Sequence, residues 1–448
     1  MKRLFGTDGI RGVAGKSPLD SATVYAIGLA LAHSLAKKAP SPRVLLGMDT
    51  RESSEWIAAT LTAGLTEGGA SVESAGVITT PGVAFLTHKH GFAAGVVISA
   101  SHNPWEDNGI KLFGSDGYKL PDAIEVAIEE EIFRQLADLK TPGEELTPPE
   151  VNEADRAEYV QFLLAAVPGL SLAGRRIVID CANGAASSVA PQLFAGLGGE
   201  VVITHASPDG RNINENCGAL HPEIVAAQVK QCKASVGITF DGDADRALFA
   251  DENGCVVNGD AILLLAGRDL QARGLLTNST VVATTMSNMG LEAALKRSGI
   301  QMLRAAVGDK YVLEQMIATG AALGGEQSGH IIFSGRSTTG DGLLTALLLL
   351  DIVHRSGKML TELVTDLKVF PQVIVNVKVR EKRPLDGIPA VAAAIRAAEM
   401  ELADTGRVVI RYSGTEALAR VMIEAESEPL MRHHADTIAA AIRTELGI

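Results

Sequence analysis

The stretch Val236-Gly-Ile-Thr-Phe-Asp-Gly-Asp-Ala-Asp-Arg-Ala-Leu-Phe-Ala250 sets a tight polar loop between two apolar runs. Each run has the composition of a short buried strand. The loop holds a carboxylate at every second position: Asp241, Asp243 and Asp245. Such groups would lie within about 5 Å of one another, and each like-charged pair costs roughly 3 kcal/mol at an effective dielectric constant of about 20. Either their pKa values rise or a cation binds. Oxygen ligands at this density suit Mg²⁺, Mn²⁺ or Ca²⁺ better than zinc.

Two other interpretations of this loop stay open. The three aspartates and Glu252 occupy positions 1, 3, 5 and 12 of an EF-hand loop. However, Arg246 stands at position 6, where that loop needs glycine, and the flanks read as strands. The loop is otherwise a solvated acidic turn, with Glu252 simply part of it. We favour a divalent-metal site.

A second polar turn, Ser99-Ala-Ser-His-Asn-Pro104, follows the apolar run at residues 94–98. A serine such as Ser101 is ordinarily a cap or turn residue. Because a metal loop occurs elsewhere in the chain, we favour Ser101 as a carrier of phosphate, with Lys111 adding a positive charge or donating a proton. His102 either hydrogen-bonds the backbone of the turn or transfers a proton. The sequence has no Gly-x-Ser-x-Gly elbow, which argues against acyl transfer.

Strands and helices alternate along the chain, which predicts mostly parallel, helix-covered sheets. A chain of 448 residues is too long for one hydrophobic core. We expect three related α/β domains with mixed or parallel sheets at residues 1–150, 151–255 and 256–368. Residues 369–448 change to strand alternation around a helix and predict a small α+β domain. Ligands of such sheets bind beyond the carboxyl ends of strands, where Ser101 falls.

The composition of the chain limits which classes of molecule it is expected to bind. The formal net charge of −13 argues against nucleic acid or an anionic membrane as the main partner. A small anionic substrate stays open if cations are gathered locally. The N-terminus lacks the apolar core of a signal peptide, and the richest apolar run, residues 343–353, is too short to span a bilayer. Four cysteines without C-x-x-C spacing indicate neither a disulfide framework nor a zinc ribbon. We expect a cytoplasmic protein with reduced thiols.

Further polar loops carry groups suited to a sugar phosphate. Residues 5–12, Phe-Gly-Thr-Asp-Gly-Ile-Arg-Gly, form a glycine-spaced polar loop with Thr7 and Arg11. Residues 324–330 supply Glu326 and Ser328 for sugar hydroxyls, with His330 as a general acid or base.

Residues 411–416, Arg-Tyr-Ser-Gly-Thr-Glu, resemble an anion cradle when Arg420 is added. The cradle would combine two guanidinium forks, two hydroxyls and a flexible glycine backbone. A hairpin with exposed arginines is the plainer alternative.

Four of these motifs, in this order and over the whole chain, resemble the α-D-phosphohexomutase superfamily: residues 99–104 with Asn108-Gly-Ile-Lys111, residues 241–246, residues 325–330 and residues 411–416. Residues 5–12, 286–290 and 338–342 and Gln327 are most similar to the members that act on glucosamine phosphates. The resemblance implies four domains around a central cleft, the last binding phosphate. It also implies an isomerase that interconverts glucosamine 6-phosphate and glucosamine 1-phosphate for UDP-N-acetylglucosamine and cell-wall (peptidoglycan precursor) synthesis.

The same resemblance implies roles for particular residues. Ser101 would be the phosphoserine, and a hexosamine 1,6-bisphosphate would be both intermediate and activator. Ser101 and the three aspartates would bind one Mg²⁺ per chain. Lys111 and Arg246 would support phosphoryl and proton transfer. Glu326 and Ser328 would hold the sugar, and the distal phosphate would be held by Arg411, Ser413, Gly414, Thr415 and Arg420. From their residue types rather than from the resemblance, we add His330 as a catalytic candidate and Thr7, Arg11 and His102 as substrate-binding candidates. A homodimer is expected from the family.

The sequence departs from the family pattern at Ala417 and Ala419 in the phosphate loop and at Met48. Alanine in place of the usual proline at 417 loosens the backbone slightly, but no group assigned to chemistry is lost. Three other functions would use the same residues: a phosphomannomutase or phosphoglucomutase, a metal-dependent sugar phosphatase that admits water, and a non-enzymatic sugar-phosphate sensor. The intact Ser101 and aspartates argue against the sensor.

Overall fold

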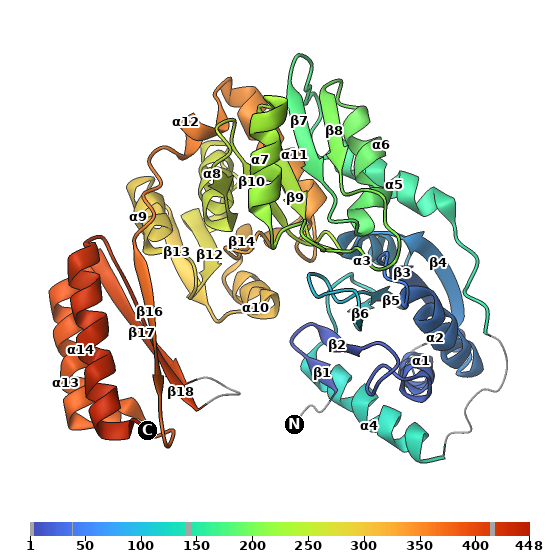
Figure 1. The fold of residues 1–448 in the computed structure, drawn as a ribbon. Helices are drawn as coiled ribbons and strands as arrows, with labels where there is room; N and C mark the ends of the chain where they lie inside the picture. Colours follow the sequence, from blue (N-terminus) through green and yellow to red (C-terminus); the bar gives the residue numbers. More distant parts are fainter. Residues whose placement is uncertain (1–3, 38, 139–145, 413–416) are drawn as a thin grey trace. The chain divides into compact units, whose positions relative to one another are not determined.

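The computed structural model describes residues 4–37, 39–138, 146–412 and 417–448, which form four β-sheets with helices packed on them (Figure 1). The chain divides into two compact units, residues 1–286 with 299–365 and residues 287–298 with 366–448. Three sheets belong to the first unit and the fourth to the second. The expected fold class, α/β with a C-terminal α+β domain, is confirmed.

The first sheet has six strands in the order β1-β2-β6-β5-β3-β4. Its strands are β1 (Phe5–Gly6), β2 (Gly9–Val13), β3 (Arg43–Met48), β4 (Ser71–Val77), β5 (Ala94–Ile98) and β6 (Asp107–Gly114). Only β4, β3 and β5 run parallel, whereas β6, β2 and β1 continue the sheet antiparallel. The expectation of a mostly parallel sheet is therefore wrong here. The polar loop expected at residues 5–12 is a hairpin, and the segment that holds Lys111 is a central strand.

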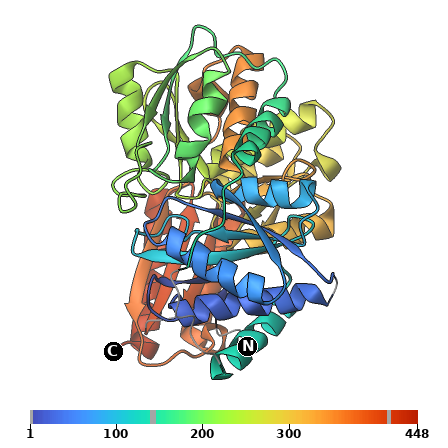
Figure 2. The same cartoon turned by 90° about the vertical axis from the view of Figure 1, so that its right-hand side faces the viewer.

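Helices cover both faces of this sheet because its buried strands are apolar on both sides. Val44 and Val96 belong to the core beneath α1 (Ser21–Ala36), α2 (Ser54–Glu67) and α4 (Asp122–Asp138). Helices α1 and α2 lie side by side (Figures 1 and 2). On the other face α3 (Thr80–Lys89) packs against the strands, close enough that a Cβ on Gly47 would lie 2.4 Å from Val83. The loop between β5 and β6 is thus anchored at both ends in a sheet that helices cover on both faces.

The second and third sheets carry the other loops of interest. The second has the order β11-β10-β9-β7-β8 and the third β13-β12-β14-β15. Their strands are β7 (Arg176–Asp180), β8 (Glu200–Thr204), β9 (Val236–Phe240), β10 (Ala247–Ala250), β11 (Val256–Val257), β12 (Thr280–Thr284), β13 (Gln301–Ala305), β14 (Leu323–Gly325) and β15 (Ile331–Phe333). The helices that follow or cover them are α5 (Glu153–Ala165), α6 (Ala190–Ala195), α7 (Pro222–Cys232), α8 (Gly259–Ala272), α10 (Asp309–Thr319), α11 (Gly342–Ser356) and α12 (Leu360–Val364). Both sheets mix parallel with antiparallel pairs.

The second unit is an antiparallel sheet with helices. Its strands, in the order β16-β18-β17, are β16 (Gln372–Lys378), β18 (Leu418–Ala425) and β17 (Gly406–Tyr412). Helices α13 (Pro389–Leu402) and α14 (Glu428–Leu446) pack on it around a core that includes Val421 and Ile438. Helix α9 (Met289–Arg297) also belongs to this unit, and its Met289 N–H donates to Glu424 Oε1 at 3.0 Å.

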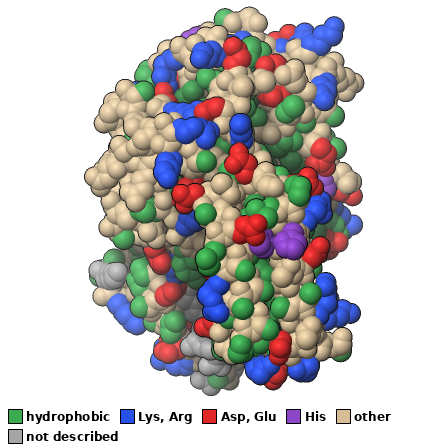
Figure 3. Space-filling view, turned by 90° about the vertical axis from the view of Figure 1, so that its left-hand side faces the viewer, with side chains coloured by type: hydrophobic (Ala, Val, Ile, Leu, Met, Phe, Trp, Pro, Cys, Tyr) green, Lys and Arg blue, Asp and Glu red, His purple; other side chains and the backbone are tan. Residues whose placement is uncertain are grey.

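On the face shown in Figure 3, acidic and basic side chains are interspersed. The four cysteines are free thiols: Cys181 and Cys217 are buried, Cys232 is half-buried and Cys255 is exposed. In the part of the chain that the structure describes, no helix combines the length and apolarity needed to cross a membrane.

Candidate active site

Two loops from different sheets meet in the first unit. The Ser101 turn follows β5, and the aspartate loop joins β9 to β10. Since β9 is parallel to β7, this loop leaves the carboxyl edge, where α/β sheets bind ligands. Ser101 Oγ donates a hydrogen bond to Asp241 Oδ2 at 2.5 Å. The structure thus brings together the hydroxyl and the carboxylates that the sequence analysis selected.

The Ser101 turn is internally ordered. Ser101 is 1% exposed and has a φ of 53°, in the left-handed region. Its N–H donates to Ser99 Oγ at 2.9 Å, and Ser99 Oγ donates to Asp49 Oδ2 at 2.6 Å. His102 Nδ1 lies 3.3 Å from Ser101 Oγ. These contacts within the turn fix the N–H of Ser101 and place its hydroxyl beside His102.

The three aspartates form a buried cluster in which one oxygen of each lies within 4.8 Å of the others. Asp243 Oδ1 and Asp245 Oδ1 accept no hydrogen bond from the described residues. A buried carboxylate oxygen without a partner is costly. These two atoms, in an all-oxygen donor set, fit a hard divalent cation. The cluster is consistent with a metal site.

The geometry argues against both alternatives for this loop. β9 and β10 pair antiparallel on either side of it, whereas an EF-hand has helices there. Burial of all three carboxylates is incompatible with a solvated turn. Glu252 lies apart from the cluster, in the turn after β10.

Burial and neighbouring charges shift the pKa values of Asp241 and Asp245 in opposite directions. Burial raises the pKa of Asp241 well above its usual value, and the charges of Asp245 and Asp243 raise it further. Burial acts in the same direction on Asp245, but Lys111 and His330 outweigh it and hold the pKa of Asp245 well below its usual value. Asp241 is therefore the harder of the two to ionise without a further cation.

Lys111 places a buried positive charge among the carboxylates of the site. It is 1% exposed, and its Nζ lies 2.8 Å from Asp243 Oδ2, 3.5 Å from Asp245 Oδ2 and 2.9 Å from Asp8 Oδ2. Burial opposes its charge, yet Asp243, Asp8 and Asp245 outweigh burial and raise the pKa of Lys111 well above its usual value. Of the two roles expected for Lys111, this environment favours the charge over the proton donor.

A cavity of about 380 Å³ opens beside the cluster. Its wall includes seven of the residues selected from the sequence: Thr7, Arg11, His102, Asp245, Arg246, Glu326 and His330. Residues from the β1–β2 hairpin, the Ser101 turn, the aspartate loop and the β14–β15 loop thus converge on one space. A volume of this size is typical of small-molecule sites.

Charged groups of both signs line this cavity: Arg11 and Arg246 lie beside the carboxylates of Asp8, Asp245, Asp309 and Glu326. Arg246 Nε lies 3.8 Å from Asp245 Oδ1 and 3.9 Å from Asp241 Oδ2. Burial, together with Arg246 and Arg11, lowers the pKa of His102 to about 4. His102 is therefore neutral near pH 7 and available as a hydrogen-bond partner.

Both ring nitrogens of His330 are engaged. Nδ1 lies 3.6 Å from Asp245 Oδ1, and the Gly340 N–H donates to Nε2 at 3.0 Å. Burial lowers the pKa of His330, but Asp245 and Asp309 outweigh it and raise the pKa above its usual value. Because an N–H points at Nε2, the tautomer that fits this arrangement carries its proton on Nδ1, facing Asp245.

The loop between β14 and β15 presents Glu326 to the cavity. Glu326 Oε1 accepts a hydrogen bond from the Gly308 N–H at 3.0 Å, which fixes its orientation. Gln327 Nε2 donates to Asp260 Oδ2 at 3.0 Å. Ser328 Oγ is buried without a hydrogen-bond partner among the described residues, and it is outside the set that lines the cavity.

The predicted phosphate loop belongs to the second unit. Arg411 and Arg420 face each other in the β17–β18 pairing, as do Tyr412 and Ala419. Ser413, Gly414 and Thr415 lie outside the described residues. The departures Ala417 and Met48 lie just before β18 and at the end of β3.

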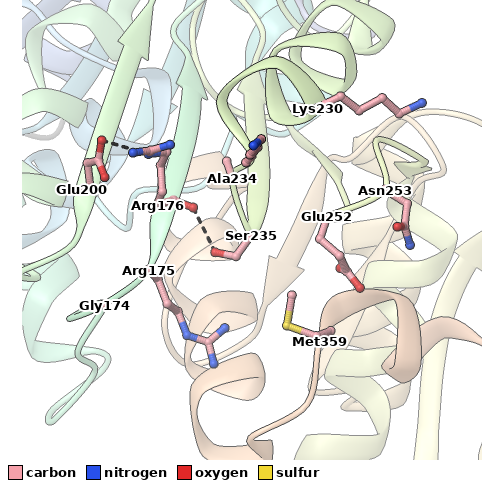
Figure 4. A pocket seen from close by; sticks show the side chains of 11 residues that line it. Gly174, Arg175, Arg176, Glu200, Lys230, Ala234, Ser235, Glu252, Asn253 and Met359 are labelled. Atoms are coloured by element: carbon pink, nitrogen blue, oxygen red, sulfur yellow. Dashed lines mark hydrogen bonds and ion pairs between the residues drawn. The ribbon is translucent and has the colours of Figure 1, made fainter.

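A larger cavity, of about 940 Å³, lies at the opposite end of the second sheet (Figure 4). Its wall holds the Arg176–Glu200 ion pair at 2.8 Å and the hydrogen bond from Ser235 Oγ to the Arg176 carbonyl at 2.9 Å. Arg175 also points toward this space. Neither Ser101 nor an aspartate of the cluster lines this cavity, so it lacks the groups that were selected for phosphoryl chemistry.

Sequence reasoning missed several partners of the site. Asp8 binds both Lys111 and Lys119, whose Nζ lies 2.5 Å from Asp8 Oδ1. Thr80 Oγ1 donates to Asp243 Oδ2 at 2.5 Å. Asp8 lies between Thr7 and Arg11 in the glycine-spaced motif at residues 5–12, so its position in that motif could have identified it. No sequence motif marks Thr80.

Comparison with known proteins places the chain in a family. Models described as phosphoglucomutase/phosphomannomutase match it in four parts: alpha/beta/alpha domain I at residues 2–138, domain II at 157–254, domain III at 258–370 and the C-terminal domain at 374–441. A phosphoglucosamine mutase of Koribacter versatilis is 61% identical over 100% of this chain and 98% of that relative. A phosphoglucosamine mutase of Solibacter usitatus is 54% identical over 100% of this chain and 99% of that relative.

The fold agrees with this relationship. A crystal structure of a phosphoglucomutase/phosphomannomutase family protein from Burkholderia thailandensis superposes with a TM-score of 0.79 at 24% identity, covering 99% of both chains. The resemblance inferred from the motifs is confirmed: the chain belongs to the phosphoglucosamine mutases of the α-D-phosphohexomutase superfamily.

Proposed function

We propose that this protein is an isomerase that interconverts glucosamine 6-phosphate and glucosamine 1-phosphate, with Ser101 as the carrier of the phosphoryl group. The observation that carries the proposal is the 2.5 Å hydrogen bond from Ser101 Oγ to Asp241 in a buried cluster of three carboxylates. The names of its full-length relatives support the choice of sugar.

For the cluster we propose one Mg²⁺ per chain, held by Ser101, Asp241, Asp243 and Asp245. The two carboxylate oxygens without hydrogen-bond partners support this choice, because Mg²⁺ takes oxygen ligands. When bound, the ion would neutralise phosphoryl oxygens on Ser101.

The proposed reaction has two transfers. In the first, the bond from phosphorus to Ser101 Oγ breaks and a bond from phosphorus to sugar O1 forms, giving glucosamine 1,6-bisphosphate. The O1 proton is taken up by His102, whose Nδ1 lies 3.3 Å from Ser101 Oγ, or by His330 once its Nε2 no longer accepts from the Gly340 N–H, and that histidine returns the proton to Ser101 Oγ. In the second transfer, the bond from phosphorus to sugar O6 breaks and a bond from phosphorus to Ser101 Oγ forms. The proton of the Ser101 hydroxyl passes to O6. The bisphosphate also activates a molecule whose Ser101 has lost its phosphate.

The remaining residues are proposed to bind and to stabilise charge. Lys111 and Arg246 would stabilise the phosphoryl group as it transfers, since both are buried or half-buried cations beside the cluster. The sugar phosphate would be bound by Thr7, Arg11, His102, Glu326 and Ser328, and the distal phosphate by Arg411, Ser413, Gly414, Thr415 and Arg420.

The product would supply UDP-N-acetylglucosamine synthesis. The protein would act in the cytoplasm and as a homodimer. Its domains would be bounded at residues 1–150, 151–255, 256–368 and 369–448.

³¹P NMR tests the proposal. The purified protein, with Mg²⁺ and a trace of the matching hexose 1,6-bisphosphate, is offered glucosamine 6-phosphate, glucose 6-phosphate and mannose 6-phosphate in turn. We expect the new anomeric phosphate signal to grow fastest from glucosamine 6-phosphate. Faster conversion of glucose or mannose 6-phosphate would make the protein a phosphoglucomutase or phosphomannomutase. Growth of inorganic phosphate instead would make it a phosphatase.

A further inference from the structure

The backbone of Ser101 adopts a conformation that needs outside support. Its φ of 53° lies in the left-handed region, which costs a non-glycine residue about 1–2 kcal/mol. The Ser101 carbonyl oxygen accepts two hydrogen bonds, from Arg51 Nη2 at 3.0 Å and from Asn214 Nδ2 at 2.9 Å. The same two groups donate to the Asn103 carbonyl, at 2.8 and 3.1 Å. Two side chains therefore clamp this turn.

Arg51 ties the turn to its own sheet. It follows β3 of the first sheet and is 2% exposed. Its Nε donates to Asp49 Oδ2 at 2.9 Å, and its Nη1 donates to the Asp107 carbonyl at 3.0 Å. All of these contacts lie within the first sheet and its loops.

Asn214 ties the turn to the other sheet. It lies in the connection between β8 and α7, beside the sheet that supplies the aspartate loop, and its N–H donates to the Ala182 carbonyl at 2.9 Å. A Cβ on Gly242 would lie 2.4 Å from the Ser101 carbonyl and 3.0 Å from Asn214 Nδ2. The aspartate loop thus packs directly against this hydrogen bond.

We infer that Asn214 is a positioning residue, whose carboxamide holds the Ser101 turn of the first sheet in register with the aspartate loop of the second. The inference rests on the proposed function, which makes Ser101 the phosphoryl carrier. Without this donor the Arg51 contacts still hold the turn to the first sheet, but Ser101 Oγ shifts relative to Asp241.

Such a shift affects the chemical step more than substrate binding. A misplacement of about 1 Å costs a transfer step on the order of 100-fold in rate. Asn214 is not one of the described residues that line the 380 Å³ cavity. We therefore expect variants of Asn214 to bind sugar phosphate as the wild-type protein does. The signature is a lower kcat with a nearly unchanged KM.

Two substitutions of Asn214 and one control separate positioning from packing. N214D keeps the shape of the side chain but places an acceptor oxygen against two carbonyl oxygens. N214A removes the donor without adding charge. N183A is the matched control, because Asn183 is a 7% exposed amide in the same group of loops that donates to the Asn212 carbonyl at 3.2 Å instead of to the Ser101 turn.

The experiment measures kcat and KM for glucosamine 6-phosphate, with thermal unfolding as the check on folding. We expect both Asn214 variants to lose about 100-fold in kcat with KM within about threefold, and N183A to keep kcat within about threefold. Wild-type kcat in both Asn214 variants, an equal loss in N183A, or a change confined to KM would overturn the inference. If N214D does not fold, the kcat and KM of N214A, compared with those of N183A, decide the inference.

A second readout separates this inference from the proposed function. If the wild-type protein converts no glucosamine 6-phosphate, the proposed function fails. Phosphorylation of Ser101 by a hexose 1,6-bisphosphate, followed by intact-protein mass spectrometry, then decides the inference. Slower phosphorylation of N214A than of N183A supports it, and equal rates overturn it.

Discussion

Replacing Asp341 by asparagine should make the protein more stable, relative to the wild-type protein, near neutral pH than near pH 4. Asp341 is the N-cap of α11: its Oδ1 accepts a hydrogen bond from the Leu344 N–H at 2.9 Å, and its Oδ2 accepts one from Tyr159 Oη at 2.8 Å. The side chain is 2% exposed, and burial raises the pKa of Asp341 from its ordinary 3.8 to about 6.

The sign and size of the effect follow from this shift. The folded state binds the proton of Asp341 more tightly than the unfolded state does. Its contribution to stability is therefore complete below about pH 4 and is lost as the pH rises to about 6. A shift of about two pKa units corresponds to about 3 kcal/mol. Asparagine keeps an oxygen for the Leu344 N–H and does not ionise.

Urea unfolding of the wild-type protein and D341N between about pH 4 and pH 7 measures this difference. The free energy of unfolding of D341N, minus that of the wild-type protein, should rise by about 2 kcal/mol over this range, because the unfolded carboxyl group is already partly ionised at pH 4. D20N is the matched control, because Asp20 also caps a helix, accepting from the Thr23 N–H at 3.0 Å, but is only half-buried. A difference that stays constant with pH, or one that falls, would refute the reasoning.

Three further predictions concern the site and the second unit. S101A should abolish conversion in the ³¹P NMR assay while the protein stays folded; residual turnover would place the phosphoryl carrier elsewhere. D243N should weaken Mn²⁺ binding at least about tenfold by isothermal titration calorimetry, because a charged oxygen ligand is lost; unchanged affinity would mean that the ion binds outside the cluster. R407A should destabilise the second unit by about 3 kcal/mol, because Arg407 Nε lies 2.6 Å from the buried carboxylate of Glu424; proteolysis of that unit at the wild-type rate would contradict this.

Many strands could be predicted from the sequence. The apolar runs at residues 43–48, 94–98, 176–180 and 236–240 are strands with those bounds, because strands buried on both faces read as continuous apolar runs. The hairpin at residues 5–13 could not, because glycine and polar residues interrupt its alternation. Its strand character comes from pairing with β6, which is distant in the sequence.

Some residues of the candidate site could likewise be predicted from the sequence, and others could not. The meeting of Ser101 with the three aspartates could be predicted, because their motifs are local and their residue types suit one chemistry; their catalytic roles stay a proposal. The approach of Asn214 and Thr80 could not be predicted, because the residues of the site that they contact are more than 100 positions away in the sequence. Such contacts are set by how the sheets of the first unit pack, and no local pattern records them.

The most direct test of the account follows phosphate from Ser101 itself. The protein is labelled on Ser101 with radioactive phosphate from a hexose 1,6-bisphosphate and mixed with glucosamine 6-phosphate in a quenched-flow apparatus. We predict that the label leaves the protein for the sugar at a rate equal to or above kcat. Label that stays on the protein during turnover, or that appears as inorganic phosphate, would contradict Ser101 as the phosphoryl carrier of a mutase.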